Sequence, residues 1–489
     1  MGTLAKNMLA LLGSQIASWA MALLMLIIVP KYLGDQQFGQ FNFAVSFVAF
    51  FGLFAGLGGG QFIVKETARN NSLLGLYVFN ALVMGLALAA VLSGAAIGLA
   101  HFLDYPSETC LVVALVCIGM TITTVNTTLY SGLQGLQRMT RPAIWVVLDR
   151  YIGGVAVFAA LVARRGLIGV AVATSLYGWA SLLGNGSRLF RPVWNNARLD
   201  LRVWRLLAVG GMPFLFWNLV LAIYGSIDIV MLSKLAGDAV VGWYALAYRL
   251  VGMPIFLATI VTTALLPELS AQSRRMSPDF AALVNRSVRL VFFASAPMTV
   301  GVALVAGDLI AFLHYPTRFA HSVPLIQILA LHIPVVGITM VLGTALMACD
   351  RQKQWVAVGV IASVFNPVLN FIAIPATTRA FGNGAVGASV ITVATELLML
   401  GGALFLMHPH GVLDRRTQSF LGRCTLACAV MASLVFVTGG IWLPIRIIVG
   451  IVTYAIVSLL LGTLSANELR RRFHQTVVLL RSHGAVRTS

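Results

Sequence analysis

Two copies of one motif organise the chain: KYLGDQQFGQFNFA at residues 31–44 and KLAGDAVVGWYALA at residues 234–247. At an offset of 203 positions the copies share five identical residues: Lys31, Gly34, Asp35, Gly39 and Ala44 match Lys234, Gly237, Asp238, Gly242 and Ala247. Each copy ends one long apolar run and opens another. Self-similarity at a fixed offset is typical of an internally duplicated chain. Duplicated halves recur in membrane transporters, whose sites lie between the repeats.

The composition indicates a membrane protein. The 489 residues are 59% hydrophobic and 10% charged, with a mean hydropathy of +0.92, whereas soluble domains carry about 25% charged residues. A spanning backbone must satisfy its own hydrogen bonds, which predicts an all-α polytopic membrane protein. A spanning helix needs roughly 20 apolar residues, and about 14 runs qualify: 8–29, 40–57, 76–100, 110–133, 142–162, 167–189, 208–232, 241–266, 288–309, 323–348, 355–375, 385–407, 420–439 and 442–464.

The net charge of +18 is explained by orientation in the membrane. With the N-terminus placed in the cytoplasm, 24 of the 33 Lys and Arg residues fall in cytoplasmic segments and seven fall in outer ones. Cytoplasmic loops of membrane proteins carry such an excess. We therefore expect both termini in the cytoplasm, and no nucleic-acid partner.

The duplication predicts the domain plan. Spans 1–6 form an N-terminal lobe (residues 1–190), spans 7–12 a C-terminal lobe (208–407), and spans 13 and 14 are appended (408–465). Six spans per half make the repeats parallel. Residues 191–207, RPVWNNARLDLRVWRLL, are too polar to span and predict an amphipathic cytoplasmic helix, with an ordinary polar linker as the alternative. Residues 466–489 form a basic cytoplasmic tail.

Three stretches carry a family resemblance. They are PKYLGDQQFGQFNFAVSFVAFFGLFAGLGGGQFIVKETAR at 30–69, the segment 212–275 that opens MPFLFWNLVLAIYGSIDIVMLSKLAGDAVVGWYALAYRL, and IASVFNPVLNFIAIP with GNGAVGASVITVATELL at 361–375 and 382–398. They resemble the bacterial polysaccharide-transporter flippases of the multidrug/oligosaccharidyl-lipid/polysaccharide exporter superfamily. The resemblance implies two six-helix lobes around a central cavity, with two further C-terminal helices.

The same resemblance implies the function and the partners. It implies a flippase of the bacterial inner membrane that carries undecaprenyl-diphosphate-linked oligosaccharide between leaflets for O-antigen, exopolysaccharide or capsule synthesis. The partners implied are this lipid-linked substrate, membrane lipid, and a polysaccharide polymerase with its chain-length machinery. Neither the sugar nor the coupling ion is implied.

Charged residues inside the spans are the candidate substrate path, because a charge at the bilayer centre costs about 2.5–3.5 kcal/mol. Asp228 and Arg249 lie in adjacent spans at similar depth, either as a structural ion pair or with Arg249 lining the cavity and Asp228 orienting it. Asp149 and Arg150 are sequence neighbours, so their side chains point about 100° apart on a helix. Arg150 is a candidate substrate contact, and Asp149 a substrate-path candidate or a buried partner of another span. Arginine suits a diphosphate because its planar guanidinium group makes bidentate hydrogen bonds to phosphate oxygens.

Glu396, Asn366 and Asn370 complete the candidate path, and His332 is a weaker addition. An intramembrane carboxylate such as Glu396 is either a proton or cation relay or a protonated hydrogen-bonding group. Asn366 and Asn370 lie one helical turn apart, which favours hydrogen bonding between helices.

Two other function classes stay open. A cation-coupled drug or metabolite antiporter of the same superfamily would have an acidic cavity, which the intramembrane arginines disfavour. A membrane enzyme acting on lipid-linked sugars would be expected to show a large outer loop or a carboxylate–metal site, and the loops here are short. The five cysteines form no CxxC motif and no Cys/His cluster, so we expect no metal site and no cofactor. The short loops and the lack of a carboxylate cluster lead us to expect no enzymatic activity.

Overall fold

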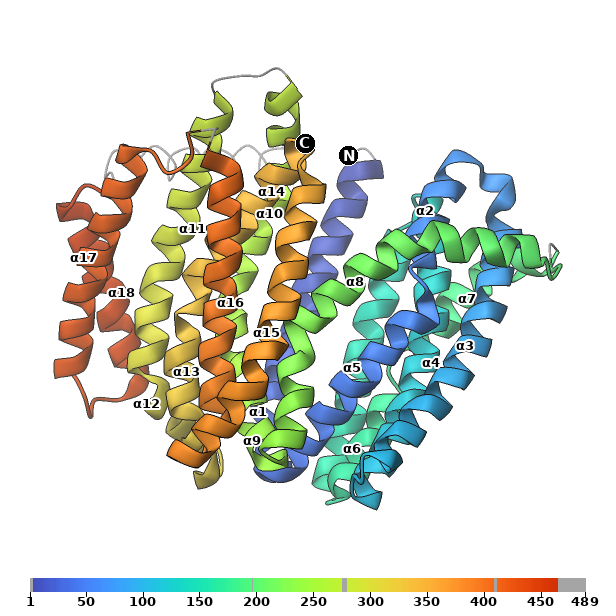
Figure 1. Ribbon diagram of the computed structural model, residues 1–489, viewed down its shortest axis with the longest axis horizontal. Helices are drawn as coiled ribbons and strands as arrows, with labels where there is room; N and C mark the ends of the chain where they lie inside the picture. Colours follow the sequence, from blue (N-terminus) through green and yellow to red (C-terminus); the bar gives the residue numbers. More distant parts are fainter. Residues whose placement is uncertain (1–2, 196, 275–278, 409–410, 465–489) are drawn as a thin grey trace, which may run out of the picture. The chain divides into compact units, whose positions relative to one another are not determined.

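The structure, a computed structural model, describes residues 3–195, 197–274, 279–408 and 411–464 (Figure 1). These residues are almost entirely helical, and no strand occurs among them. The described part contains 13 helices long and apolar enough to cross a membrane. The prediction of an all-α polytopic membrane protein is therefore confirmed. The predicted basic tail, 466–489, lies outside the described residues.

The helices form two compact units. The first unit takes in the residues up to Leu246, His314–Ser322 and Gly359–Ile391. Its complete elements are α1 (Thr3–Gly56), α2 (Gly59–Arg69), η1 (Asn71–Leu73), α3 (Leu74–Phe102), α4 (Ser107–Gly135), α5 (Thr140–Val162), α6 (Gly166–Ser175), α7 (Trp179–Trp194), α8 (Leu201–Leu235) and η3 (Thr317–Ser322).

The second unit takes in Ala247–Leu313, Val323–Val358 and the residues from Thr392 onward. Its complete elements are η2 (Met253–Ile255), α10 (Phe256–Arg274), α11 (Asp279–Leu304), α12 (Ala306–Phe312), α13 (Val323–Ala330), α14 (His332–Ala348), α17 (Arg415–Val437) and α18 (Leu443–Leu460). Three helices contribute residues to both units: α9 (Asp238–Gly252), α15 (Gln352–Phe381) and α16 (Gly384–Met407). The division into lobes 1–190 and 208–407 stays a prediction.

The first two predicted spans, 8–29 and 40–57, are two helices that meet at a kink and share the label α1. Helix α1 is interrupted at Gly34, whose φ of 72° and ψ of −179° are not helical. The candidate span Gly13–Arg69 therefore contains both predicted spans, which accounts for the difference between fourteen predicted spans and thirteen observed ones.

Each copy of the repeated motif interrupts a helix at its first glycine. Gly34 and its repeat equivalent Gly237 both have a positive φ, 72° and 92°. Side chains with a Cβ rarely adopt this region, so glycine is the residue that permits the reversal. The identical glycines found by sequence comparison thus both lie where the backbone leaves the helical conformation.

The two copies of the motif also pack on each other. A Cβ added to Gly39 would overlap the carbonyl oxygen of Asp238, and a Cβ added to Gly242 would overlap that of Asp35. The indole Nε1 of Trp243 donates to Oδ2 of Asp35 at 3.0 Å. The glycine contacts are reciprocal between equivalent residues, as an axis relating the two repeats requires.

The residues of the predicted amphipathic segment, 191–207, are divided between two helices in the structure. Its first residues end α7 at Trp194, and its last residues begin α8 at Leu201. The break falls before Asp200, whose side chain accepts a hydrogen bond from the backbone N–H of Arg202 and caps α8. A strong N-cap starts a new helix, and α8 then runs on without interruption into the predicted span 7.

The appended spans 13 and 14 form α17 and α18, which pack on α11. Arg446 of α18 is buried and pairs with Asp308, while its Nη2 donates to the carbonyl of Val435 at 3.0 Å. The hydroxyl of Tyr454 donates to the carbonyl of Phe293 at 2.9 Å. Polar anchors of this kind fix helices whose remaining contacts are apolar.

Candidate functional site

A buried polar cluster in the first unit joins three helices. Oδ2 of Asp228, on α8, accepts a hydrogen bond from the hydroxyl of Tyr244, on α9, at 2.8 Å. Oδ1 of Asp228 accepts from Nδ2 of Asn370, on α15, at 2.6 Å. The same Nδ2 also donates to Oδ1 of Asn366 at 2.9 Å. The structure thus brings together three of the predicted site residues and adds Tyr244.

The cluster suits a buried anionic carboxylate. Asp228, Tyr244, Asn366 and Asn370 are all at most 4% exposed. Each oxygen of Asp228 receives a donor, which compensates the cost of removing a charge from water. Oδ1 of Asn370 is buried and has no hydrogen-bond partner in the described part of the chain. The cluster therefore offers one unused acceptor beside a carboxylate. The pairing of Asp228 with Arg249 stays a prediction.

Asp149 caps a neighbouring helix. Its two carboxylate oxygens accept from the backbone N–H groups of Ala180 at 2.8 Å and Ser181 at 3.0 Å. These groups belong to the first turn of α7, where N–H groups have no partner within the helix. Gly178, with a φ of 97°, turns the chain into that helix. The structure gives Asp149 a positioning role, while a role in the substrate path stays a prediction.

Arg150 and Arg249 are exposed, unlike the buried acids. The guanidinium carbon of Arg150 lies 5.9 Å from the centroid of the Tyr177 ring, within cation–π range. Arg249 belongs to the second unit, on α9. Both residues lie in candidate membrane spans, Thr140–Val162 and Asp238–Gln272, and their role as substrate contacts stays a prediction.

Glu396 and His332 form a second buried pair, in the second unit. Nδ1 of His332, at the start of α14, lies 3.9 Å from Oε1 of Glu396, on α16. Glu396 is 1% exposed, and neither of its oxygens has a hydrogen-bond partner in the described residues. The ring of Tyr248 lies beside His332, with centroids 6.2 Å apart. An unsatisfied carboxyl is costly when charged, so this pair is suited to holding a proton.

Two features of these sites escaped sequence reasoning. Tyr244 lies about as many residues after Gly237 as Asp228 lies before it. The sequence therefore placed Tyr244 at the membrane depth of Asp228, but it did not show which way the Tyr244 side chain points. Arg446 interrupts an apolar run of α18, which signals a buried partner, but nothing in the sequence names Asp308. No group of three or more His, Cys, Asp or Glu side chains placed to hold a metal occurs among the residues that the structure describes.

The thirteen candidate spans of the described residues define a multi-pass membrane protein. The family model described as "Polysaccharide biosynthesis protein" matches residues 4–272, and the chain belongs to that family. The model described as "Lipid II flippase MurJ" matches residues 185–453.

One curated relative and two solved structures are similar to this chain. "Probable flippase AglR" of Haloferax volcanii is 25% identical over 224 residues, so the match spans only 45% of either chain. Lipid II flippase MurJ in an inward closed conformation is similar with a TM-score of 0.72 and 16% identity, over 93% of this chain and 98% of that one. A multidrug resistance MATE family transporter in an inward-facing conformation gives a TM-score of 0.64 and 15% identity, over 81% and 98%. At these identities the structures establish the fold.

Proposed function

We propose that this protein is a flippase that moves undecaprenyl-diphosphate-linked oligosaccharide across the bacterial inner membrane by alternating access. The observation that carries the proposal is membership of the polysaccharide biosynthesis family together with the MurJ match over the second half. The exposed guanidinium groups of Arg150 and Arg249 suit the substrate's diphosphate. In this proposal the protein performs no covalent chemistry, both termini are cytoplasmic, and a polymerase receives the cargo.

The buried groups take separate roles in this proposal. Asp228 with Tyr244, Asn366 and Asn370 holds α8, α9 and α15 in register within the first unit. The Glu396–His332 pair is the proton-binding group of the second unit. Intramembrane carboxylates commonly serve as relays, and a pair without other partners can take or give a proton with little rearrangement.

Complementation tests the proposal. The gene is expressed in a bacterium that lacks its own polysaccharide flippase, and surface polysaccharide is followed together with the lipid-linked precursor. We expect the wild-type protein to restore surface polysaccharide and to clear the accumulated precursor. Normal membrane insertion without either effect, across several precursor types, would overturn the proposal.

A second candidate is a cation-coupled multidrug or metabolite antiporter. The specific observation in its favour is the fold likeness to the multidrug resistance transporter. It predicts increased resistance to toxic cations on overexpression, abolished by Glu396→Gln. Resistance without any change in surface polysaccharide would favour it over the flippase.

A further inference from the structure

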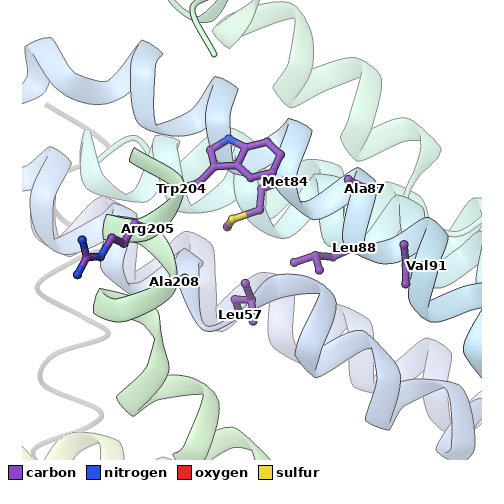
Figure 2. Close-up of a pocket in the computed structure, with 8 residues that line it drawn as sticks. All are labelled: Leu57, Met84, Ala87, Leu88, Val91, Trp204, Arg205 and Ala208. Atoms are coloured by element: carbon purple, nitrogen blue, oxygen red, sulfur yellow. The ribbon is translucent and has the colours of Figure 1, made fainter. Parts of the chain in front are cut away.

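An open apolar groove lies on the first unit, apart from the polar clusters. Its volume is about 400 Å³, and Figure 2 shows Arg205 and Val91 at opposite ends of the lining residues. The lining residues come from α1 and its end, α3 and α8: Leu57, Met84, Ala87, Leu88, Val91, Trp204, Arg205 and Ala208. Arg205 is the one charged residue among them.

The floor of the groove is one face of α3. Met84, Leu88 and Val91 follow helical spacing, so they lie in a row along the helix. At 1.5 Å per residue, the row from Met84 to Val91 is about 10 Å long, roughly two thirds of the ~15 Å hydrocarbon layer of one leaflet. Val91 is 69% exposed and Met84 is 6% exposed. The groove therefore deepens toward the end where Trp204 and Arg205 lie.

A hydrogen-bonded clamp fixes the Trp204 wall. The side chain of Asn80, fully buried on α3, donates to the carbonyl of Arg198 at 2.9 Å. Its Oδ1 accepts from the backbone N–H of Asp200 at 3.0 Å and from the indole Nε1 of Trp204 at 3.1 Å. One asparagine thus holds the start of α8 and the ring of Trp204 against α3. This wall of the groove is preformed.

Glycines hold the opposite wall in place. Helix α1 ends at Gly56, and the next two residues, Leu57 and Gly58, have positive φ values of 45° and 65°. A Cβ on Gly58 would overlap the carbonyl of Gly211, and a Cβ on Gly211 would overlap that of Leu57. This close crossing of α8 over the end of α1 positions Leu57 across from α3 and keeps the groove open between the helices.

The charge at the deep end is positive and available. Arg205 is exposed, no partner of its guanidinium is present among the described residues, and Figure 2 shows it pointing away from the apolar row. Arg198 and Arg202 are exposed on the same segment. Asp200, the nearby acid, is engaged as the N-cap of α8. The excess of basic residues at this end assigns it to the cytoplasmic side.

We propose that this groove binds an anionic glycerophospholipid of the cytoplasmic leaflet. One acyl chain lies along Met84, Leu88 and Val91, and the head-group phosphate meets Arg205. Basic pockets between spanning helices on the cytoplasmic side suit anionic head groups, and a tryptophan at the interface suits the boundary between chain and head group. The site lies outside the proposed substrate path and binds lipid whether or not cargo is present.

Native mass spectrometry of the purified full-length protein tests this proposal. Phosphatidylglycerol and phosphatidylethanolamine with identical chains, and separately a polyprenyl phosphate, are titrated into the detergent-solubilised protein, and bound lipid is counted. Ala87→Phe fills the groove, and its control is Ala90→Phe, at an exposed position on the same helix outside the groove. Arg205→Gln removes the cation, and its control is Arg202→Gln, three residues earlier. Melting of each variant without added lipid checks folding.

We expect wild type to retain phosphatidylglycerol preferentially. Ala87→Phe should lose that retention while Ala90→Phe keeps it. Arg205→Gln should weaken phosphatidylglycerol binding about fivefold, since one basic residue near an anionic surface contributes about that factor. Arg205→Gln should leave the binding of phosphatidylethanolamine unchanged. Arg202→Gln should weaken phosphatidylglycerol binding less than Arg205→Gln does. Equal retention by Ala87→Phe and Ala90→Phe would overturn the proposal. Binding of polyprenyl phosphate in place of phosphatidylglycerol would overturn it as well.

Discussion

Gly39 and Gly242 occupy equivalent positions in the two repeats, and each faces the backbone of the other repeat. Gly39 lies against the carbonyl of Asp238, and Gly242 lies against the carbonyl of Asp35. Asp35 and Asp238 are themselves equivalent at the 203-residue offset. The two copies of the motif therefore pack against each other, and a side chain at either glycine would overlap backbone of the other copy.

Alanine at either glycine should therefore destabilise the protein. The added Cβ would overlap backbone atoms, which cannot move aside as the end of a flexible side chain can. We therefore expect Gly39→Ala and Gly242→Ala each to lose about 2 kcal/mol or more of folding stability. The melting transition of the detergent-solubilised protein measures this. Gly94→Ala is the control, because no atom lies within 4 Å of the added Cβ and alanine favours a helix. Equal melting of all three variants would show that the motifs do not pack so closely.

Asp149 should prove structural. Asp149→Ala leaves the N–H groups of Ala180 and Ser181 without their acceptor, and we expect a loss of about 1–3 kcal/mol. Asp149→Asn keeps one acceptor oxygen and should lose less. Thermal melting and transport are measured on the same preparations. Lost transport with unchanged melting of Asp149→Ala would assign the residue to the substrate path instead.

Glu396 should show the opposite balance between stability and activity. Its two oxygens have no hydrogen-bond partner in the described residues, so Glu396→Leu removes a costly buried group and should leave stability unchanged or raise it. Transport should fall in Glu396→Leu and in Glu396→Gln, because neither side chain can exchange a proton. Strong destabilisation by Glu396→Leu, or full transport by Glu396→Gln, would contradict a proton-binding role.

Asp414 should make the α17–α18 hairpin sensitive to acid. The nearby Thr417 hydroxyl, with the hydrogen bond of 2.7 Å from the Thr417 backbone N–H, lowers the pKa of Asp414. A lowered folded-state pKa stabilises the fold above the unfolded-state value of about 3.9, and this stabilisation is lost as the pH falls through the folded-state pKa.

The matching variants separate capping from charge. Asp414→Ala should cost about 1 kcal/mol at neutral pH, and its difference from wild type should shrink below pH 4. Asp414→Asn keeps a capping oxygen but does not titrate, so its stability should not change with pH through this group. Melting between pH 3 and 7 measures both, and a wild type as insensitive to acid as Asp414→Asn would contradict the assignment.

The sequence was sufficient for the helices and for the repeat, because hydropathy and glycine spacing are local signals. Span limits followed from apolar length, and the turns at Gly34 and Gly237 followed from the shared motif. Polar residues inside apolar runs were also readable, which marked Asp228, Asn366 and Asn370 as site candidates, but their contact with one another was not predicted.

Direction around each helix was not readable, and partners depend on it. Asp149 was identified as an intramembrane charge. Its role as a hydrogen-bond acceptor depends on tertiary packing, which brings the start of α7 beside it. Residues 191–207 looked amphipathic throughout, yet the cap at Asp200 divided them between two helices. Asn80 gave no signal as an isolated polar residue in an apolar run, although it fixes the wall of the lipid groove.

The proposal that the protein flips a lipid-linked saccharide is tested most directly in proteoliposomes. A fluorescent polyprenyl-diphosphate oligosaccharide is placed in both leaflets, and a membrane-impermeant quencher reports which molecules have crossed. Wild type should make the inner pool accessible, and Arg150→Ala with Arg249→Ala should slow this at least tenfold. Arg150→Lys with Arg249→Lys should lie between, since lysine keeps the charge but loses the paired bonds to phosphate. An inner pool as protected with wild type as in empty liposomes, or crossing at the wild-type rate without both arginines, would contradict the account.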